Sequence, residues 1–204
     1  MTSSSDEQLK IRLLAAAKTE FLSNGYAGAN VGRIASAAGI SKKTVYKYVA
    51  SKQALLFEVM ADVLSGPAQR MAQASPEQSL ASRLELYLEG FSTLAFSEQG
   101  LASYRLLMSE GARFPELAEA YVNSLDQYAL QPVARELEQA ARMGHIVQQD
   151  YRLATRMLFS MVAAETLRDA AIGLGAVPDE AQRKALVAQA LSIFLHGISG
   201  PARG

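Results

Sequence analysis

Residues 30–48 read NVGRIASAAGISKKTVYKY, and this stretch decides the fold of the N-terminal part of the chain. Helices are predicted over residues 31–38 and 42–48, with Gly39 between them to adopt the left-handed backbone that a tight turn requires. Ala35 is small at the point where the second helix must cross the first. The positions that face inward are apolar: Ile34, Ala38, Ile40 and Val45. The stretch therefore predicts two short helices packed across a tight turn.

The second of these helices presents a basic face to the outside. Ser41 can cap its N-terminus. Its outward positions are Lys42, Lys43, Thr44, Tyr46 and Lys47. A short, basic helix with a capped N-terminus is what a helix-turn-helix inserts into the major groove of DNA. The alternative is an ordinary helical hairpin whose basic face is only solvated.

Individual side chains of this helix suit particular DNA contacts. Lys42 and Lys43 lie in the first turn and can donate to guanine O6 and N7 or to a phosphate. Thr44 offers a methyl group to thymine and a hydroxyl to a base or a phosphate. Tyr46 is expected to point toward the DNA backbone, whereas Tyr48 either reaches a phosphate or closes the small core.

Residues outside this helix complete the predicted interface. Lys52, in the first turn of the next helix, suits a phosphate clamp together with nearby backbone N–H groups. Arg33 and Asn30 mark the other flank of the groove. The predicted DNA contacts are therefore Asn30, Arg33, Lys42, Lys43, Thr44, Tyr46, Lys47, Tyr48 and Lys52.

Charge is distributed unevenly along a chain whose formal net charge is zero. Residues 1–53 carry eight basic and three acidic side chains, whereas residues 54–204 carry 12 basic and 17 acidic ones. No acidic side chain occurs from Phe21 to Phe57. Unless this clustering is due to chance, a polyanion is attracted to one end of the molecule and repelled from the other.

The chain of 204 residues, half of them apolar, is long enough for one large or two small domains. Sustained alternation of apolar and polar residues is absent, so the predicted fold is all-α. The first helix is expected to end at Gly25. The later helices are predicted over residues 52–64 (where Gly66-Pro67 breaks or weakens the helix), 77–96, 101–110, 115–144 (with a kink at Pro132), 150–172 and 179–197. The expected domains are residues 1–53 and 54–204.

The N-terminal motifs resemble those of the TetR (tetracycline-repressor-like) family of regulators over residues 9 to 60. They are the stretch from GY at 25–26 through IA at 34–35, AGIS at 38–41, TVYKY at 44–48 and SKQALL at 51–56. The resemblance implies a three-helix DNA-binding domain joined by the fourth helix to a bundle that binds a ligand and dimerises. It also implies DNA contacts at Lys42, Lys43, Thr44, Tyr46 and Lys52.

The motif departs from the family pattern at three positions: Ala29 replaces a common Thr, Val49 a common aromatic residue, and Gly32 leaves a frequent contact position without a side chain. The glycine puts base readout from the second helix in doubt, but not the fold. The segment over residues 103–118 also looks like the C-terminal domain of one TetR subgroup.

Two copies of the chain are expected, because two recognition helices must reach half-sites about 34 Å apart on DNA. The last two predicted helices offer apolar and small-residue stripes that suit a four-helix interface. The interface candidates are Leu153, Ser160, Ala164, Leu167, Leu186, Ala190, Ile193, Phe194 and Gly197. The alternative is that these stripes face the core of their own subunit.

Aromatic and methionine side chains in the middle of the chain suit an apolar pocket for a small effector. The pocket candidates are Phe91, Tyr104, Met108, Phe114, Tyr121, Met157 and Met161. For each of them, an ordinary place in the core is the alternative.

Specific catalytic motifs are absent from the sequence. The chain has no cysteine, no glycine-rich phosphate loop and no nucleophile elbow, and His145 and His196 lack metal-ligand spacing. We therefore expect no enzymatic activity, no cofactor and no metal. No apolar stretch is long enough for a signal peptide or a membrane span, and the absence of cysteine fits a cytoplasmic protein.

Two functions are compatible with these features. The first is a homodimeric repressor that binds a palindromic operator in double-stranded DNA and is released by a small, largely apolar effector. The second is a helical protein that binds a small molecule or a partner, with or without catalysis, and whose basic end docks a partner protein. The salt dependence of DNA binding separates them, since phosphate contacts give a steep dependence.

Overall fold

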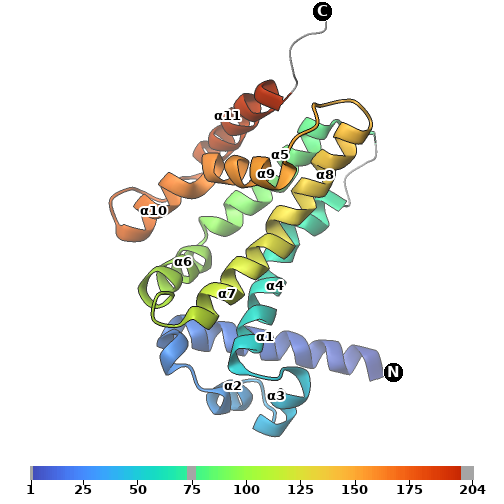
Figure 1. The fold of residues 1–204 in the computed structure, drawn as a ribbon. Helices are drawn as coiled ribbons and strands as arrows, with labels where there is room; N and C mark the ends of the chain where they lie inside the picture. Colours follow the sequence, from blue (N-terminus) through green and yellow to red (C-terminus); the bar gives the residue numbers. More distant parts are fainter. Residues whose placement is uncertain (1, 73–76, 199–204) are drawn as a thin grey trace, which may run out of the picture. The chain divides into compact units, whose positions relative to one another are not determined.

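The computed structural model describes residues 2–72 and 77–198, and this part of the chain contains helices and no strand (Figure 1). It divides into two compact units: Met1–Val63 with Ala102–Ser124, and Leu64–Leu101 with Leu125–Gly204. The contacts therefore group residues 102–124 with the N-terminal helices, unlike the boundary expected after residue 53. Within the described residues, no helix is both long and apolar enough to cross a membrane.

The first unit contains the predicted helix-turn-helix. Its elements are α1 (Thr2–Gly28), α2 (Val31–Ala37), α3 (Lys42–Tyr48), the beginning of α4 (Lys52–Ala72), most of α6 (Glu98–Glu110) and α7 (Pro115–Ser124). The core combines Phe21 of α1, Ile34 of α2, Val45 of α3, Leu55 of α4 and Leu117 of α7, each at most 2% exposed. Apolar positions spaced by three or four residues thus bury one face of each helix.

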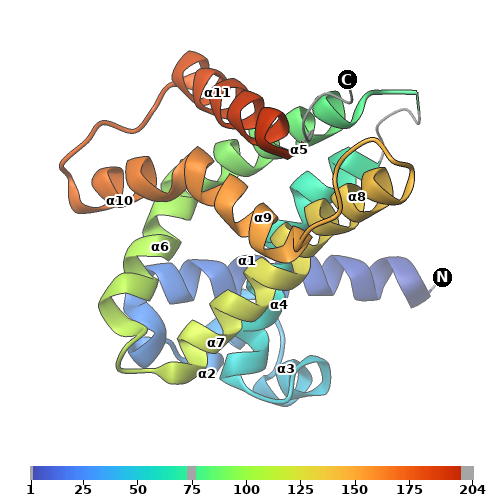
Figure 2. The same cartoon turned by 45° about the horizontal axis from the view of Figure 1, so that its top comes forward.

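The second unit is a separate helical bundle. Its elements are α5 (Leu80–Ala95), η1 (Leu125–Leu130), α8 (Gln131–Arg142), α9 (Tyr151–Phe159), η2 (Ser160–Ala164), α10 (Glu165–Ile172) and α11 (Glu180–Ile198), together with the remainder of α4 and α6. In Figure 2, α11 lies along α5. Leu84, Leu88, Leu137, Leu158 and Val187 are completely buried between these helices. The bundle therefore has its own core and does not depend on the first unit for one.

One predicted helix boundary is wrong. The dipeptide Gly66-Pro67 was expected to break or weaken the helix, yet α4 continues through it to Ala72 and spans 21 residues. A proline removes a single N–H donor from the helix. The remaining hydrogen bonds of this long helix carry it past that one missing donor.

A π-helical turn precedes Pro132, the position where the sequence predicts a kink. The helical segment from Pro115 to Arg142 contains η1, which ends two residues before this proline. Pro132 has no N–H to donate to the carbonyl of Tyr128, four residues earlier. The hydroxyl of Tyr87 on α5 donates to the carbonyl of Ala129 at 2.7 Å and lies 3.4 Å from that of Tyr128. A side chain from another helix thus supplies a donor where the helix is irregular.

We expect Tyr87→Phe to lower the free energy of unfolding by about 1 kcal/mol, because it leaves a buried carbonyl of the π-helical turn without its donor. The Tyr87 side chain is completely buried, and burial raises the pKa of its hydroxyl. Urea denaturation measures the change, with Tyr46→Phe on the surface as the control. Equal stabilities of the two variants would contradict this role of the hydroxyl.

Candidate DNA-binding site

The turn between α2 and α3 has the predicted geometry. Gly39 adopts a φ of +71°, and the N–H of Ile40 donates to the carbonyl of Ala35 at 3.0 Å. Ala35 is 2% exposed, and Val45 on α3 is completely buried. The small side chain at 35 and the left-handed glycine at 39 therefore allow the two helices to pack as a helix-turn-helix.

Both helices begin at the predicted caps. The side-chain oxygen of Asn30 accepts from the N–H groups of Gly32 at 2.7 Å and Arg33 at 3.3 Å. Ser41 Oγ accepts from the N–H of Thr44 at 3.0 Å. A Cβ on Gly32 would lie 2.9 Å from Asn30 Oδ1, so this glycine leaves room for the cap. The absence of a side chain at position 32 thus allows the Asn30 cap to form.

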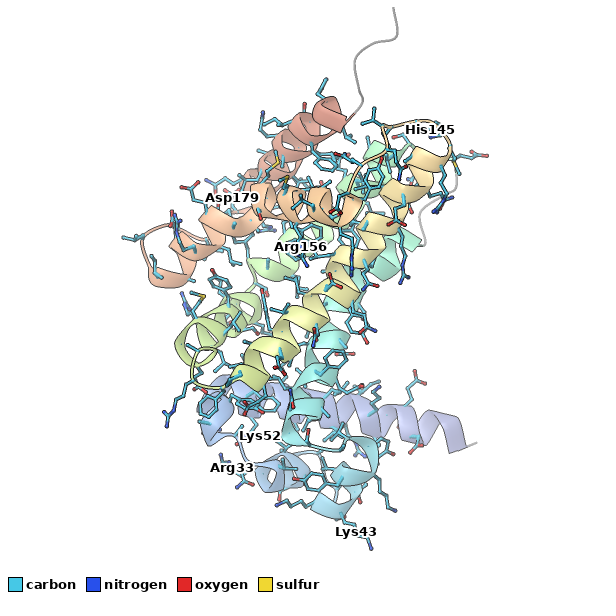
Figure 3. All side chains as sticks on the ribbon, viewed as in Figure 1. Arg33, Lys43, Lys52, His145, Arg156 and Asp179 are labelled. Carbon is cyan, nitrogen blue, oxygen red and sulfur yellow. The ribbon has the colours of Figure 1, made fainter. Side chains whose placement is uncertain are left out.

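The predicted DNA-reading face of α3 is exposed. Lys42, Lys43 and Lys47 are exposed, and Tyr46 and Tyr48 are 45% and 38% exposed. In Figure 3 the side chain of Lys43 extends away from the helices into solvent. Lys42 Nζ lies 6.0 Å from the centre of the Tyr46 ring, one helical turn away. Tyr48 is therefore not part of the small core, and its contact with a phosphate stays a prediction.

The side chain of Thr44 is less accessible to DNA than its neighbours on α3. Its side chain is half-buried, and its hydroxyl lies 2.8 Å from Ser41 Oγ, within the cap. The hydroxyl is therefore part of the helix start. The predicted contact of Thr44 with thymine rests on its methyl group.

Arg33 holds α2 to α1. Its Nε donates to Glu20 Oε1 at 2.9 Å, and its Nη2 donates to the same oxygen at 2.5 Å and to the carbonyl of Gly28 at 2.7 Å. Glu20 Oε1 also accepts from the N–H of Asn30 at 2.9 Å. The hydrogen bond from Arg33 holds the pKa of Glu20 below its ordinary value. Arg33 and Asn30, which sequence reasoning assigned to DNA, therefore also fix the orientation of α2.

We expect Glu20→Gln to lower the free energy of unfolding by about 1–2 kcal/mol at neutral pH, because charged hydrogen bonds at the α1–α2 junction are lost. Since the folded pKa of Glu20 lies below its ordinary value of 4.5, the stabilisation is complete above pH 4.5 and is lost as the pH falls through the folded pKa. Urea denaturation across this pH range should show the difference from wild type shrinking in acid. A difference that is constant with pH would contradict the assignment.

Lys52 anchors the start of α4 to the end of α1. Its Nζ donates to the carbonyl of Tyr26 at 2.7 Å and lies 4.5 Å from the centre of the Tyr26 ring. Figure 3 shows Lys52 at the start of α4. The side chain is half-buried, and its contact with a phosphate stays a prediction.

Glu110 is a residue of this unit that sequence reasoning missed. α1 is interrupted at Gly25, whose φ is +69°, and a further helical turn starts at Tyr26. Glu110 Oε2 accepts from the N–H groups of Tyr26 at 3.0 Å and Ala27 at 3.1 Å, as a carboxylate at a helix N-terminus does. Phe114 packs edge-on against the Tyr26 ring. Only a contact between residues 84 positions apart reveals this role, so no local signal could have found it.

The predicted dimer residues fall into two groups in the second unit. Leu153, Ser160, Ala164, Ile193 and Gly197 are exposed. Ala190 and Phe194 lie in the core of their own bundle, and Leu167 and Leu186 are half-buried. One side of α11 therefore faces the core of its own subunit, as the alternative proposed. The other side of α11 is exposed and could contact a second subunit.

The predicted pocket residues are divided between the two units. Phe91 packs against Phe159 in the second core, with ring centres 4.5 Å apart. Phe114 packs on the first core. Met108, Met157 and Met161 are exposed, while Tyr104 and Tyr121 are half-buried. Burial raises the pKa of Tyr121. Met157 and Met161 lie on the same exposed face of α9 and η2 as Leu153.

Comparisons with known families agree with this geometry. The family "Bacterial regulatory proteins, tetR family" matches residues 13–59, which include α2 and α3. The family "AefR-like transcriptional repressor, C-terminal domain" matches residues 82–197, more than half of the chain. The chain belongs to the TetR family of bacterial transcriptional regulators. Its helix-turn-helix is therefore a DNA-binding element, as the resemblance predicted. No curated protein matches the sequence.

Solved structures share the fold of this TetR-family regulator. A putative TetR-family regulator from Mesorhizobium loti MAFF303099 is 23% identical, with a TM-score of 0.77 over 95% of this chain and 98% of that one. The flavonoid-responsive regulator FrrA is 26% identical, with a TM-score of 0.66 over 96% and 100%. The regulator FadR from Bacillus subtilis, solved with stearoyl-CoA, is 23% identical, with a TM-score of 0.68 over 92% and 98%.

Proposed function

We propose that this TetR-family regulator is a homodimeric repressor that binds a palindromic operator and leaves it when a small, largely apolar effector binds. The observation that carries the proposal is the exposed basic face of α3, with Lys42, Lys43 and Tyr46 outside and Val45 buried beneath them. This face has the charge and the shape that entry into the major groove requires. The match to an AefR-like repressor domain supports repression.

Dimerisation is supported by exposed apolar side chains on α9, η2 and α11 of the second unit. Leu153, Met157 and Met161 are 49%, 56% and 39% exposed on α9 and η2, and Ile193 on α11 is 55% exposed. Exposed apolar side chains that gather on one face are typical of a protein interface. Small residues beside them, such as Ala164, allow two helices to approach closely. Two such helices from each subunit would form a four-helix interface.

We expect Met157→Glu combined with Ile193→Glu to convert the dimer to a monomer, because four carboxylates would be buried per interface. Light scattering measures the mass in solution. The control is Met108→Glu, which adds a charge at a 66% exposed methionine of the first unit. A double variant that keeps the dimeric mass would contradict the proposed interface.

The effector is proposed from the relatives. FrrA is flavonoid-responsive and FadR was solved with stearoyl-CoA, and both ligands are large and partly apolar. Aromatic and methionine side chains suit such molecules. The predicted pocket residues, Phe91 and Tyr121 among them, remain candidates for this role. Stearoyl-CoA and a flavonoid are therefore the first probes for release of bound DNA.

A gel shift at two salt concentrations tests the proposed function. Genomic fragments from the region around the gene supply the DNA. A repressor should bind one fragment with an affinity that falls steeply as salt rises, since each phosphate contact releases a counterion. Binding to no fragment at low salt would contradict DNA recognition and would favour a basic end that docks a partner protein.

A further inference from the structure

An acidic side chain reaches the last residue of the basic helix α3. Tyr48 is the last residue of α3, and its hydroxyl donates to Asp6 Oδ1 at 2.5 Å. The two residues are 42 positions apart in the sequence. The stretch from Phe21 to Phe57 holds no acidic residue, but the fold brings Asp6 to the end of α3.

Asp6 belongs to a face of α1 that makes contacts at several points along the helix. One helical turn further on, Lys10 Nζ forms an ion pair with Glu58 Oε2 on α4 at 2.9 Å. Leu13 and Ala17 continue the same face and are buried in the first core. Asp6 and Lys10 thus form the outer end of a face that fixes the rotation of α1, which aims the carboxylate at Tyr48.

The contact with Asp6 competes with a contact to DNA. A phenol has a single O–H to donate, and Asp6 accepts it. A phosphate that accepts from Tyr48 must therefore displace a carboxylate, which also repels the phosphate. The hydrogen bond to Asp6 raises the pKa of Tyr48, which agrees with a hydroxyl held in its protonated form.

We propose that Asp6 is a positioning residue of the DNA interface, which holds the Tyr48 hydroxyl off the DNA backbone and lowers affinity for DNA of any sequence. This inference rests on the proposed DNA binding through α3. Backbone contacts carry no sequence information, so the effect applies equally to operator and unrelated DNA. The contact therefore shortens the time that the regulator stays bound to DNA of either kind.

The test is the affinity of the full-length protein for a labelled mixed-sequence DNA duplex, measured by fluorescence anisotropy at low salt. Asp6→Ala should bind about twofold to fivefold more tightly for each bound subunit, the range expected for an exposed charged contact. Glu7→Ala is the matched control, since it removes the same charge from the adjacent exposed residue. It should increase affinity less than Asp6→Ala does.

The role of the Tyr48 hydroxyl is isolated by a second pair of variants. In a Tyr48→Phe background, Asp6→Ala should increase affinity no more than Glu7→Ala does. A tyrosine titration in the ultraviolet, without DNA, should show one pKa lower in Asp6→Ala than in wild type, because the hydrogen bond that raises it is gone. A merely structural role of Asp6 would not link these two readouts.

Three results would overturn the proposal. They are equal gains for Asp6→Ala and Glu7→Ala, a gain that persists undiminished with Tyr48→Phe, and an unchanged tyrosine titration. If the wild-type protein binds no duplex at any salt concentration, the proposed function fails together with this inference. Wild-type binding with equal gains for both variants refutes the role of Asp6 alone.

Discussion

Lys43→Ala combined with Tyr46→Ala should weaken binding to the operator by about 1,000-fold while leaving the protein folded. A base or backbone contact of this kind contributes about 1–3 kcal/mol, and a dimer loses each contact twice. Both side chains are exposed, so their removal leaves the core of the first unit unchanged. Val45, which lies between them in sequence, is the residue that holds α3 in place.

Fluorescence anisotropy on the operator fragment measures this loss, and circular dichroism checks that the variant is folded. Arg142→Ala is the charge control, because it removes one exposed positive charge from the second unit. Its affinity should stay within about threefold of wild type, since a single exposed charge outside the DNA-binding unit is screened by salt. Undiminished operator binding by the double variant would show that α3 is not the recognition helix.

Gly25→Ala should be the most destabilising of the small substitutions, with a loss of about 3–4 kcal/mol of unfolding free energy. The φ of +69° alone costs a side chain about 1–2 kcal/mol. In addition, a Cβ at this position would lie within contact distance of the Glu110 carboxylate, which must then leave the N–H groups of Tyr26 and Ala27. The loss of these charged hydrogen bonds adds about 1–3 kcal/mol.

Gly39→Ala is a matched control for this prediction. Gly39 has nearly the same φ, +71°, but a Cβ there would meet no atom within 4 Å. The Gly39→Ala variant should therefore lose only the unfolding free energy that the positive φ costs a side chain. Urea denaturation of both variants, and of Gly25→Ala combined with Glu110→Ala, separates the two causes. The account of Glu110 as a helix cap fails if Gly25→Ala costs no more than Gly39→Ala.

Features set by local hydrogen bonds could be predicted from the sequence. The caps at Asn30 and Ser41 and the turn at Gly39 depend on side chains and backbone groups within five residues of one another. The spacing of these residues in the sequence is therefore enough to predict the caps and the turn. The exposed side of α3 follows from the same spacing, because Val45 must face inward.

Features set by distant parts of the chain could not be predicted. The hydrogen bonds from the end of α1 to Glu110, and from Tyr48 to Asp6, join residues about 84 and 42 positions apart. Periodicity predicts that a helix has an apolar stripe, but not which partner covers it. Ala190 and Phe194 therefore qualified as interface residues although they fill their own core, beside the exposed Ile193.

Glycine and proline residues within helices were also not enough to predict where a helix is interrupted. Gly66-Pro67 does not interrupt α4, whereas Pro132 follows a π-helical turn that Tyr87 helps to satisfy. A proline removes one N–H donor, and its effect depends on the surrounding hydrogen bonds. At the π-helical turn before Pro132 these include a bond from Tyr87 on another helix, which the local sequence alone does not reveal.

The most direct measurement is the sequencing of genomic DNA fragments that the purified protein retains, compared with those retained by the Lys43→Ala and Tyr46→Ala double variant. The account predicts that wild type enriches a sequence with two-fold symmetry, whose halves lie about one helical turn or a multiple of it apart, and that the double variant does not enrich it. Enrichment of the same fragments by both proteins, or of no symmetric sequence by wild type, would contradict it.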